Sequence, residues 1–550
     1  MPLHYILNIK DSTESIMLGR APLLPTFFPF SMSYHVSAEG HGSHALIVAF
    51  VVAALSWWVL SRRKASLPYP PGPKGQFLVG NIFDLPPHSE WVAYNRWCRE
   101  LGSDLVYLRV AGKGILVLDT LEAANDLFDK RSSIYSSRPQ FPMVGELMGW
   151  KWLFAGMEYG EPWRERRRLF TKYFSPTAAA KYGPIKMKFV REMLPCLLDT
   201  PEDFLEIVRH ALGGLTISLA YGLPIKKVHD PYIDLAERAM VALAAGSLPG
   251  AFLVNVIPLL KYIPDWFPGA GFKRKAKQWR KLQEDFRGIP FEQTAENMAA
   301  GTANPCFTTA CLEKLSESKD PVQQRELIKD TAGIVFAAGA DTIISTTQTF
   351  FSAMLCFPEA QEKAQEELDR VLSGRLPEFD DEADMPYMAA LIREILRWQT
   401  AVPVAIPHST TADDVYKGYF IPKGTLVMGN VWAMLRDEKH YPEPSKFSPE
   451  RFLKDGKLNP DVLDPIQIVF GWGRRACPGS HIALSLVWLT AATVLSVFDI
   501  SRAIDENGNE IEPSSGVQPG LICPPLPFKC TIKPRSEDAV ELIMSVADTV

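Results

Sequence analysis

The sequence Phe470-Gly-Trp-Gly-Arg-Arg-Ala-Cys-Pro-Gly479 joins a single cysteine to a glycine-rich turn. The residues before it predict a short strand, and the residues after it predict a helix that begins near Pro478. A thiolate at the start of a helix is stabilised by the positive end of the helix dipole and by nearby backbone N–H groups, and Arg475 adds a positive charge. Gly473 and the last glycine of the stretch let a flat ligand approach the backbone. Cys477 therefore suits a single axial ligand to iron better than a zinc cluster.

Two other interpretations of this stretch have to be weighed. Gly471-Trp-Gly-Arg-Arg-Ala476 fits the GxGxxA fingerprint of dinucleotide-binding folds. Pro478 would then lie inside the following helix, and the next acidic residue, Asp499, comes 28 residues after Gly471 instead of the usual spacing of about 20. The second alternative is a purely structural cysteine. The other cysteines, at positions 98, 196, 306, 311, 356, 523 and 530, are too sparse for a disulfide framework and form no CxxC pair, so we expect them to be reduced.

The stretch resembles the haem-binding signature of the cytochrome P450 family, Phe-x-x-Gly-x-Arg-x-Cys-x-Gly. Its five fixed positions are filled by Phe470, Gly473, Arg475, Cys477 and Gly479. The resemblance implies a cytochrome P450 fold, mainly α with small β-sheets, that binds haem b. It also implies that Cys477 is the axial thiolate ligand of the haem iron, that Arg475 holds a propionate, and that the other three residues form the cofactor-binding loop.

Two further motifs follow the order found in the family. Glu394 and Arg397 lie three residues apart on one helix face and resemble the Glu-x-x-Arg pair, which Arg451 completes as a structural triad. Ala338-Gly-Ala-Asp-Thr342 lies in a long apolar stretch and is similar to the oxygen-activation motif. Gly339 and a threonine hydroxyl bonded to the backbone can open a local groove in a helix. The resemblance implies catalytic roles for Thr342, which helps hold oxygen, and for Asp341, which assists proton delivery through water.

Trp163 and Arg167 are four residues apart and hence on one helix face. They resemble the Trp-x-x-x-Arg motif whose residues reach a haem propionate, and His408 resembles a further propionate contact, although it could be an ordinary loop histidine. A second, outward stripe consists of Arg164, Arg168 and Lys172. It is either a solvated basic face or the docking surface for an acidic electron donor.

The amino-terminal region predicts a membrane anchor. Residues 42–61 are about 30 Å long as a helix, enough to cross a bilayer, and Trp57 and Trp58 lie near its end. Basic residues follow the segment, which places the body in the cytosol; a cleaved signal peptide would have them before it. A buried core helix is the remaining alternative. The predicted organisation is a lumenal tail over 1–41, the anchor, a basic and proline-rich linker over 62–75, the haem-thiolate domain over 76–535 and a tail over 536–550. Translation from Met32 would leave residues 1–31 outside the working protein.

Composition and periodicity describe the body. The chain of 550 residues has 58 basic and 63 acidic side chains and a formal net charge of −5, which argues against nucleic-acid binding. Residues 107–118 predict a β-hairpin, and residues 416–427 carry further strand signals. Most other segments predict helices, at 163–174, 325–356, 358–372, 386–398 and 481–498. Helices thus dominate a single large domain.

These features lead to one functional prediction. We expect a haem-thiolate monooxygenase, single-pass in the endoplasmic reticulum membrane, that oxidises a lipophilic secondary metabolite with O2. Electrons would come from NADPH through cytochrome P450 reductase, with cytochrome b5 as an additional donor. The alternatives are an isomerase or dehydratase of the same fold, or a non-catalytic haem- or lipid-binding membrane protein. The resemblance implies that residues 143–152, Phe336 and 402–405 line the substrate pocket, and their apolar character favours a terpenoid, polycyclic aromatic or indole-like substrate. Residues 253–275 suit a membrane-surface element or a core segment.

Overall fold

Helices dominate the part of the chain that the structure describes, as the sequence predicts. The computed structural model describes residues 67–547, apart from 78, 87, 248–250 and 515. The predicted anchor and the Met32 alternative lie outside these residues. The long helices are α2 (Glu90–Leu101), α5 (Glu161–Phe174), α7 (Gly183–Asp199), α8 (Phe204–Tyr221), α9 (Pro231–Ser247), α10 (Gly271–Ala299), α12 (Pro321–Cys356), α13 (Pro358–Leu372), α14 (Pro386–Trp398), α17 (Ser480–Val497) and α18 (Glu537–Ala547).

Shorter helical turns connect these helices. The short α-helices are α3 (Leu121–Ala124), α4 (Ser132–Tyr135), α6 (Pro176–Ala179), α11 (Phe307–Leu312), α15 (Val431–Met434) and α16 (Ile466–Val469). Two turns are π-helical, η3 (Asn125–Lys130) and η4 (Pro142–Leu147). The 3₁₀ turns are η5 (Trp150–Trp152), η6 (Phe154–Gly156), η7 (Ala180–Tyr182), η8 (Pro201–Asp203), η9 (Leu253–Asn255), η10 (Pro258–Tyr262), η11 (Leu315–Glu317), η12 (Phe379–Asp384), η13 (Pro449–Phe452) and η14 (Gly473–Arg475).

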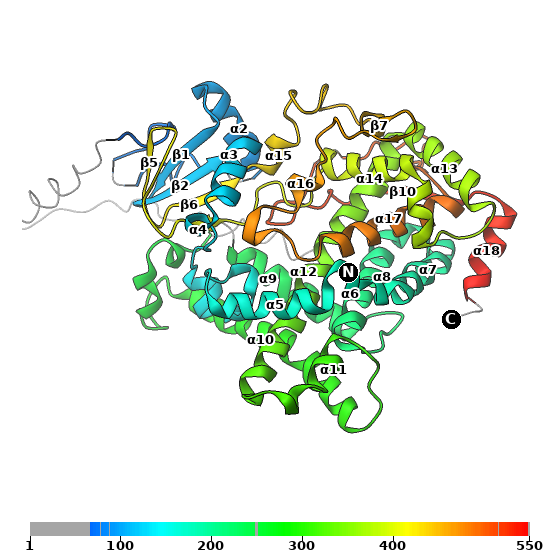
Figure 1. Ribbon diagram of the computed structural model, residues 1–550, viewed down its shortest axis with the longest axis horizontal. Helices are drawn as coiled ribbons and strands as arrows, with labels where there is room; N and C mark the ends of the chain where they lie inside the picture. The colour runs from blue at the N-terminus through cyan, green and yellow to red at the C-terminus, as the bar shows by residue number, and fades with distance from the viewer. Residues whose placement is uncertain (1–66, 78, 87, 248–250, 515, 548–550) are drawn as a thin grey trace, which may run out of the picture. The chain divides into compact units, whose positions relative to one another are not determined.

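The strands form one small mixed sheet and three two-stranded ribbons. Their bounds are β1 (Leu105–Val110), β2 (Lys113–Leu118), β3 (His408–Ser409), β4 (Asp414–Tyr416), β5 (Tyr419–Ile421), β6 (Leu426–Gly429), β7 (Leu453–Lys454), β8 (Lys457–Leu458), β9 (Phe498–Arg502) and β10 (Cys530–Pro534). The mixed sheet has the order β1-β2-β6-β3, with β2 and β6 parallel. Figure 1 shows β1, β2 and β6 side by side at one side of the described unit, next to the long helices.

The predicted hairpin is present, but its turn is shorter than the four residues, 111–114, that separate the two apolar runs of the sequence. Only Ala111 and Gly112 connect β1 to β2, and both have positive φ, 45° and 84°. This is the conformation that a two-residue hairpin turn requires. Gly114 lies inside β2, where a Cβ would come within 2.1 Å of the Tyr107 hydroxyl.

The core is built around α12. Its residues from Ile328 onward are mostly buried, and it packs against α5, α8, α10 and α17. Among the described residues, α17 is the one helix long and apolar enough to cross a membrane, but most of it is buried in the core. Its apolar character therefore reflects burial in the protein. Residues 537–547, which the sequence analysis set apart as a tail, form α18, which packs on α7 with Ile543 fully buried.

The prediction of a strand before the cysteine turn is wrong. Residues 466–469 form the short helix α16. Asp464 accepts a hydrogen bond from the backbone N–H of Ile466 at 3.0 Å, and Pro465 is the residue directly before the helix. Four apolar residues are too few to distinguish a strand from a helical turn by their pattern.

Candidate functional site

The cysteine turn is a short, hydrogen-bonded loop between α16 and α17. The backbone N–H of Cys477 donates to the carbonyl of Phe470 at 2.8 Å, and Gly479 is the residue before α17. The side chain of Cys477 is accessible although protein atoms crowd around it. This burial raises the pKa of the Cys477 thiol, while the backbone N–H of Gly479 and the charge of Arg167 lower it. The net pKa of the Cys477 thiol is therefore raised, so burial outweighs the expected preference of the helix start for the thiolate, and the cation that lowers this pKa is Arg167 and not the predicted Arg475.

The two glycines of the signature have different surroundings. Gly473 has φ +51°, and a Cβ there would lie 2.5 Å from the carbonyl oxygen of Phe128 in η3. A Cβ on Gly479 would make only an ordinary contact, 3.9 Å from Phe170. Glycine is thus required at position 473 because the turn packs closely on η3. The atoms that a Cβ would meet belong to η3, so this contact does not support the expectation that Gly473 makes room for a flat ligand.

Three arginine side chains meet beside this turn. Arg475 donates to the carbonyls of Ser136 at 2.7 Å and of Phe154 at 3.2 Å. Arg138 is 6% exposed and donates to the carbonyls of Ala155 and Pro407. Burial lowers the pKa of Arg138. The charge of the nearby Arg475 guanidinium group lowers it further.

Trp163 and Arg167 come from α5 and lie on one face of it, as the sequence predicts. Arg475 stacks on the ring of Trp163 at 4.5 Å, and Arg167 lies 6.0 Å from the same ring. Burial lowers the pKa of Arg167. The pKa of Arg475 is lowered to about 10, first by burial and then by the charge of Arg167. The α5 face therefore adds a third cation to the cluster.

His408 lies next to the same cluster. It is 4% exposed, and its Nδ1 is 2.6 Å from the carbonyl oxygen of Tyr135. Burial, followed by the charges of Arg138 and Arg475, lowers its pKa well below the usual value, so the ring is neutral. A loop histidine exposed to solvent is excluded.

The cluster has no carboxylate of its own. Within the described part of the chain, Arg138, Arg167 and Arg475 make no ion pair with an acidic side chain. Arg138 and Arg475 donate to backbone carbonyls, and Arg475 also stacks on the Trp163 ring. Arg167 lies near the same ring and near the Cys477 thiol. Buried cations normally require anionic partners. The arrangement fits a ligand that carries carboxylates at its edge and accepts a thiolate, which is the donor set expected for haem.

Asp341 and Thr342 lie in α12, which stays α-helical through this region. The Thr342 hydroxyl donates to the carbonyl of Ala338 at 2.9 Å, as expected for a threonine at this position. Asp341 faces Arg209 of α8, with 3.7 Å between the carboxylate and the guanidinium group. Burial raises the pKa of Asp341, Arg209 lowers it and Glu237 raises it. A Cβ on Gly339 would be 3.1 Å from Thr216, so the glycine lets α12 approach α8.

Glu394 and Arg397 form a fully enclosed ion pair on α14. Both side chains are 0% exposed, and two N–H groups of Arg397 donate to the two carboxylate oxygens at 2.7 and 2.8 Å. The backbone N–H of Ser448 and the Nε of Arg451 also donate to Glu394, at 2.7 and 3.3 Å. The three residues of the predicted triad are therefore in contact.

Comparison with known proteins now decides the family. Residues 70–532 match the family model described as Cytochrome P450. The chain belongs to the cytochrome P450 family. It is 45% identical over 92% of its length to cytochrome P450 monooxygenase ple1 of Rhodocybe pseudopiperita, covering 97% of that protein. It is 41% identical over 92% to cytochrome P450 monooxygenase 98 of Postia placenta, covering 98%, and 40% identical over 90% to tryptamine 4-monooxygenase of Psilocybe cyanescens, covering 99%.

These similarities confirm that the protein is a cytochrome P450 monooxygenase of the fungal secondary-metabolite type. The dinucleotide fingerprint, the isomerase and the non-catalytic alternatives are thereby set aside. Membership of the family implies a haem-thiolate cofactor and a redox partner.

Sequence reasoning missed one cytochrome P450 site residue and misplaced another. No motif in the sequence pointed to Arg138 or to its burial in the cation cluster. Phe336 was predicted to line the pocket, but its ring packs on Phe286 of α10 at 4.9 Å. Ala338 follows two residues later, roughly 200° around the helix, and is exposed. Phe336 therefore faces the core.

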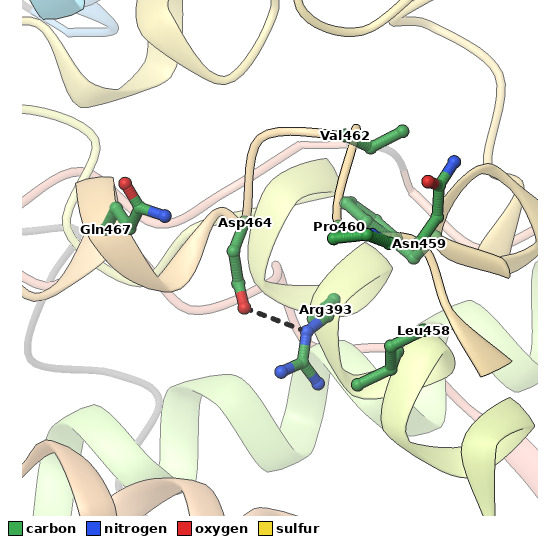
Figure 2. Close-up of a pocket in the computed structure, with 8 residues that line it drawn as sticks. Arg393, Leu458, Asn459, Pro460, Val462, Asp464 and Gln467 are labelled. Carbon is green, nitrogen blue, oxygen red and sulfur yellow. Dashed lines mark hydrogen bonds and ion pairs between the residues drawn. The ribbon is translucent and has the colours of Figure 1, made fainter. Parts of the chain in front are cut away.

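A separate cleft lies between α14 and the chain that leads into α16. Figure 2 shows its lining, including the ion pair between Arg393 and Asp464 at 3.0 Å. Its volume is about 270 Å³, and none of the predicted site residues lines it. The cleft is small for a lipophilic substrate. The ion pair between Arg393 and Asp464 instead links α14 to the segment that precedes α16 and the cysteine turn.

The two positive-φ glycines of the turn give a matched test of the packing argument. Gly473→Ala should lower the free energy of unfolding by about 2–4 kcal/mol, because the left-handed conformation and the contact with the Phe128 carbonyl are both penalised. Gly471→Ala should cost only about 1 kcal/mol, since Gly471 has φ +73° but no atom near a Cβ. Urea unfolding of both variants, followed by tryptophan fluorescence, measures the difference. Equal losses would show that the contact with η3 is unimportant.

Proposed function

We propose that Cys477 is the axial thiolate ligand of haem b and that the cation cluster holds the haem propionates. The observation that carries this proposal is the meeting of Arg138, Arg167 and Arg475 beside an accessible cysteine without a carboxylate of their own. Haem bound there supplies the activation of O2 and the acceptance of electrons. The protein supplies the thiolate, the charges at the edge of the cofactor and the walls that orient the substrate.

Proton delivery is assigned to Asp341 and Thr342. The raised pKa of Asp341 brings its proton exchange closer to neutral pH, where a general acid works best. Its contact with Arg209 directs the carboxylate towards α8. Thr342 donates its own hydrogen to Ala338 and so presents lone pairs that can accept a hydrogen bond. A water molecule between the two side chains would complete the relay.

The proposed reaction is the oxidation of a lipophilic small molecule of secondary metabolism. For a hydroxylation, the substrate, O2, NADPH and a proton give the hydroxylated product, water and NADP⁺. One relative is a tryptamine 4-monooxygenase by name, which supports including indole compounds beside terpenoid and polycyclic aromatic compounds as substrate classes. A reconstituted enzyme with reductase should be screened against these three classes with identification of products. The proposal fails if no product forms while NADPH is consumed.

The electron donor is proposed to be NADPH–cytochrome P450 reductase, with cytochrome b5 as an additional donor. Arg164, Arg168 and Lys172 line the outward face of α5, and all three are exposed. Glu161 pairs with both Arg164 and Arg168, which reduces the net charge of this face. Arg474 is also exposed beside Tyr159 and restores positive charge there. An acidic surface on the donor complements this face.

Attachment to the endoplasmic reticulum membrane is part of the proposal, with the body in the cytosol. Residues 42–61 are the proposed anchor. Residues 253–267 add an exposed apolar surface, in which Leu259, Tyr262 and Trp266 are 74%, 73% and 80% exposed. Soluble proteins seldom leave such side chains clustered in solvent, and Trp and Tyr favour the membrane interface. The membrane-surface interpretation of this segment is therefore preferred to a core segment.

Replacing the proposed ligand tests the haem assignment. Cys477→Ser should abolish the red-shifted absorption band that a thiolate gives to the reduced carbon monoxide complex, because oxygen replaces sulfur as the axial donor. Monooxygenase turnover should fall below detection. Cys356→Ser, at a partly buried cysteine of α12, is the control and should leave the band unchanged. A Cys477→Ser enzyme that keeps the band and full turnover would contradict the assignment.

Removing the Thr342 hydroxyl tests the proton relay. Thr342→Ala should leave the carbon monoxide band intact but divert electrons from product to hydrogen peroxide, because proton delivery loses its acceptor. Peroxide and product are measured per NADPH consumed. Thr346→Ala is the control, since Thr346 makes the same kind of hydrogen bond to the backbone one turn later. Unchanged coupling in Thr342→Ala would assign the protons to another group.

Membrane attachment has two components that can be separated. The full chain should resist extraction of microsomes with alkaline carbonate, and deletion of residues 1–61 should make it extractable. The shortened protein should still sediment with membranes through the apolar surface, and Tyr262→Ser with Trp266→Ser should remove this residual binding. Val322→Ser, at an exposed apolar side chain of α12, is the control and should have no effect. Extraction of the full chain by carbonate would refute the anchor.

A further inference from the structure

A buried carboxylate joins three helices behind the proposed site. Asp330 of α12 is 2% exposed. One carboxylate oxygen accepts from Nε of Arg166, in α5, at 2.9 Å, and the other accepts from Nε of Arg287, in α10, at 2.7 Å. Each arginine brings a second nitrogen to the same oxygen. Arg287 also donates to Glu326 at 2.6 Å. The chemistry proposed above makes no use of this cluster.

The cluster also holds the segment in front of α5. The Arg287 guanidinium group lies 5.8 Å from the ring centre of Trp152. Gln283, four residues earlier on α10, accepts a hydrogen bond from the Trp152 indole at 2.7 Å. A Cβ on Gly333, one turn after Asp330, would lie 2.8 Å from the Trp152 ring. The node of Asp330, Arg166, Arg287 and Trp152 therefore fixes α5, α10, α12 and η5 against one another.

Two of these helices carry residues of the proposed site: α5 carries those beside the cysteine turn, and α12 carries those proposed to deliver protons. Arg166 immediately precedes Arg167 in α5, so the two side chains leave the helix about 100° apart, Arg166 towards Asp330 and Arg167 towards the cation cluster. Asp330 lies twelve residues before Thr342, about 18 Å along α12. Asp330 is thus too far from Thr342 to take part in the chemistry, but it determines how α12 is placed against α5.

We propose that Asp330 is a positioning residue that sets Asp341 and Thr342 in register with the cofactor edge held by Trp163 and Arg167. The inference rests on the proposed function of those four residues. A carboxylate bound by two rigid guanidinium groups fixes both the distance and the orientation between the helices that carry them. Apolar packing constrains these two quantities less tightly. Loss of its charge leaves two partly buried cations facing each other and separates α5 from α12.

Asp330→Asn in the full-length holoenzyme is the primary test. Each NADPH supplies two electrons, and when product is not formed these electrons and two protons reduce O2 to hydrogen peroxide. We expect peroxide per NADPH to rise about threefold or more, because misplacement far from the chemistry is costly. We also expect faster transfer of haem to apomyoglobin, since Trp163 and Arg167 shift. The carbon monoxide band of the retained haem should stay that of a thiolate complex.

Asp381→Asn is the matched control. Asp381 of η12 is also a buried carboxylate that binds an arginine through both oxygens, Arg375, at 2.5 and 2.7 Å. It should lower the midpoint of thermal unfolding without changing coupling or haem transfer. Wild-type coupling and haem transfer in Asp330→Asn would overturn the proposal, as would an equal loss of coupling in Asp381→Asn. Either result would mean that the four residues of the node contribute only to the stability of the fold.

Two further variants keep the test decisive if Asp330→Asn does not retain haem. Asp330→Glu keeps the charge but lengthens the side chain, and Gly333→Ala pushes on Trp152 from the same helix face. Both should bind haem and release more peroxide, and normal coupling in both would overturn the proposal. Product formation by the wild-type enzyme supports the proposed function whatever these variants do. Failure of the proposed function can therefore be distinguished from failure of the positioning role of Asp330.

Discussion

The buried ion pair between Glu394 and Arg397 is the interaction on which the rest of the fold depends. An enclosed carboxylate and guanidinium group tolerate each other only with complete hydrogen bonding, and removing one partner typically costs about 3–5 kcal/mol. Arg397 also donates to the carbonyls of Leu435 and Pro444, and Arg451 donates to those of Pro442 and Lys446. Irregular backbone in this region thus obtains the partners that a helix or sheet would otherwise provide. The pair fixes the course of the chain over 435–451 against α14.

That fixed segment continues into the site. The Arg393–Asp464 pair holds the chain to the same helix, and α16 and the cysteine turn follow at once. Gly473 then lets the turn approach η3. Specificity of the fold and placement of the thiol are therefore linked through α14, although α14 contributes no group to the proposed chemistry. The long helix α12 carries the residues proposed to handle protons, on a face that packs against α8.

Local rules predicted the regular elements and the motifs, because their determinants lie within a few residues. The bounds of α13 and α14 follow from a proline at the first position and from the apolar period of 3.6. The hairpin follows from the glycine-containing residues 111–114 between two apolar runs, although the turn itself is shorter. Other features depend on partners distant in the sequence. Burial of Arg138 requires residues 155 and 406–407 to meet it, and the direction of Phe336 is set by packing on α10. The motifs thus pointed to the residues of the proposed site, whereas the partners of those residues became visible only in the fold.

The uncompensated guanidinium groups have a consequence for biogenesis. On the proposed assignment, carboxylates of the bound cofactor relieve the mutual repulsion of these groups, which would link cofactor binding thermodynamically to folding. At a free cofactor concentration one hundred times its dissociation constant, this linkage contributes about 2.7 kcal/mol to the folded state. A cell short of the prosthetic group would then contain more unfolded chain, which quality-control proteases remove. Cofactor supply would in this way regulate how much enzyme accumulates, before any change in transcription.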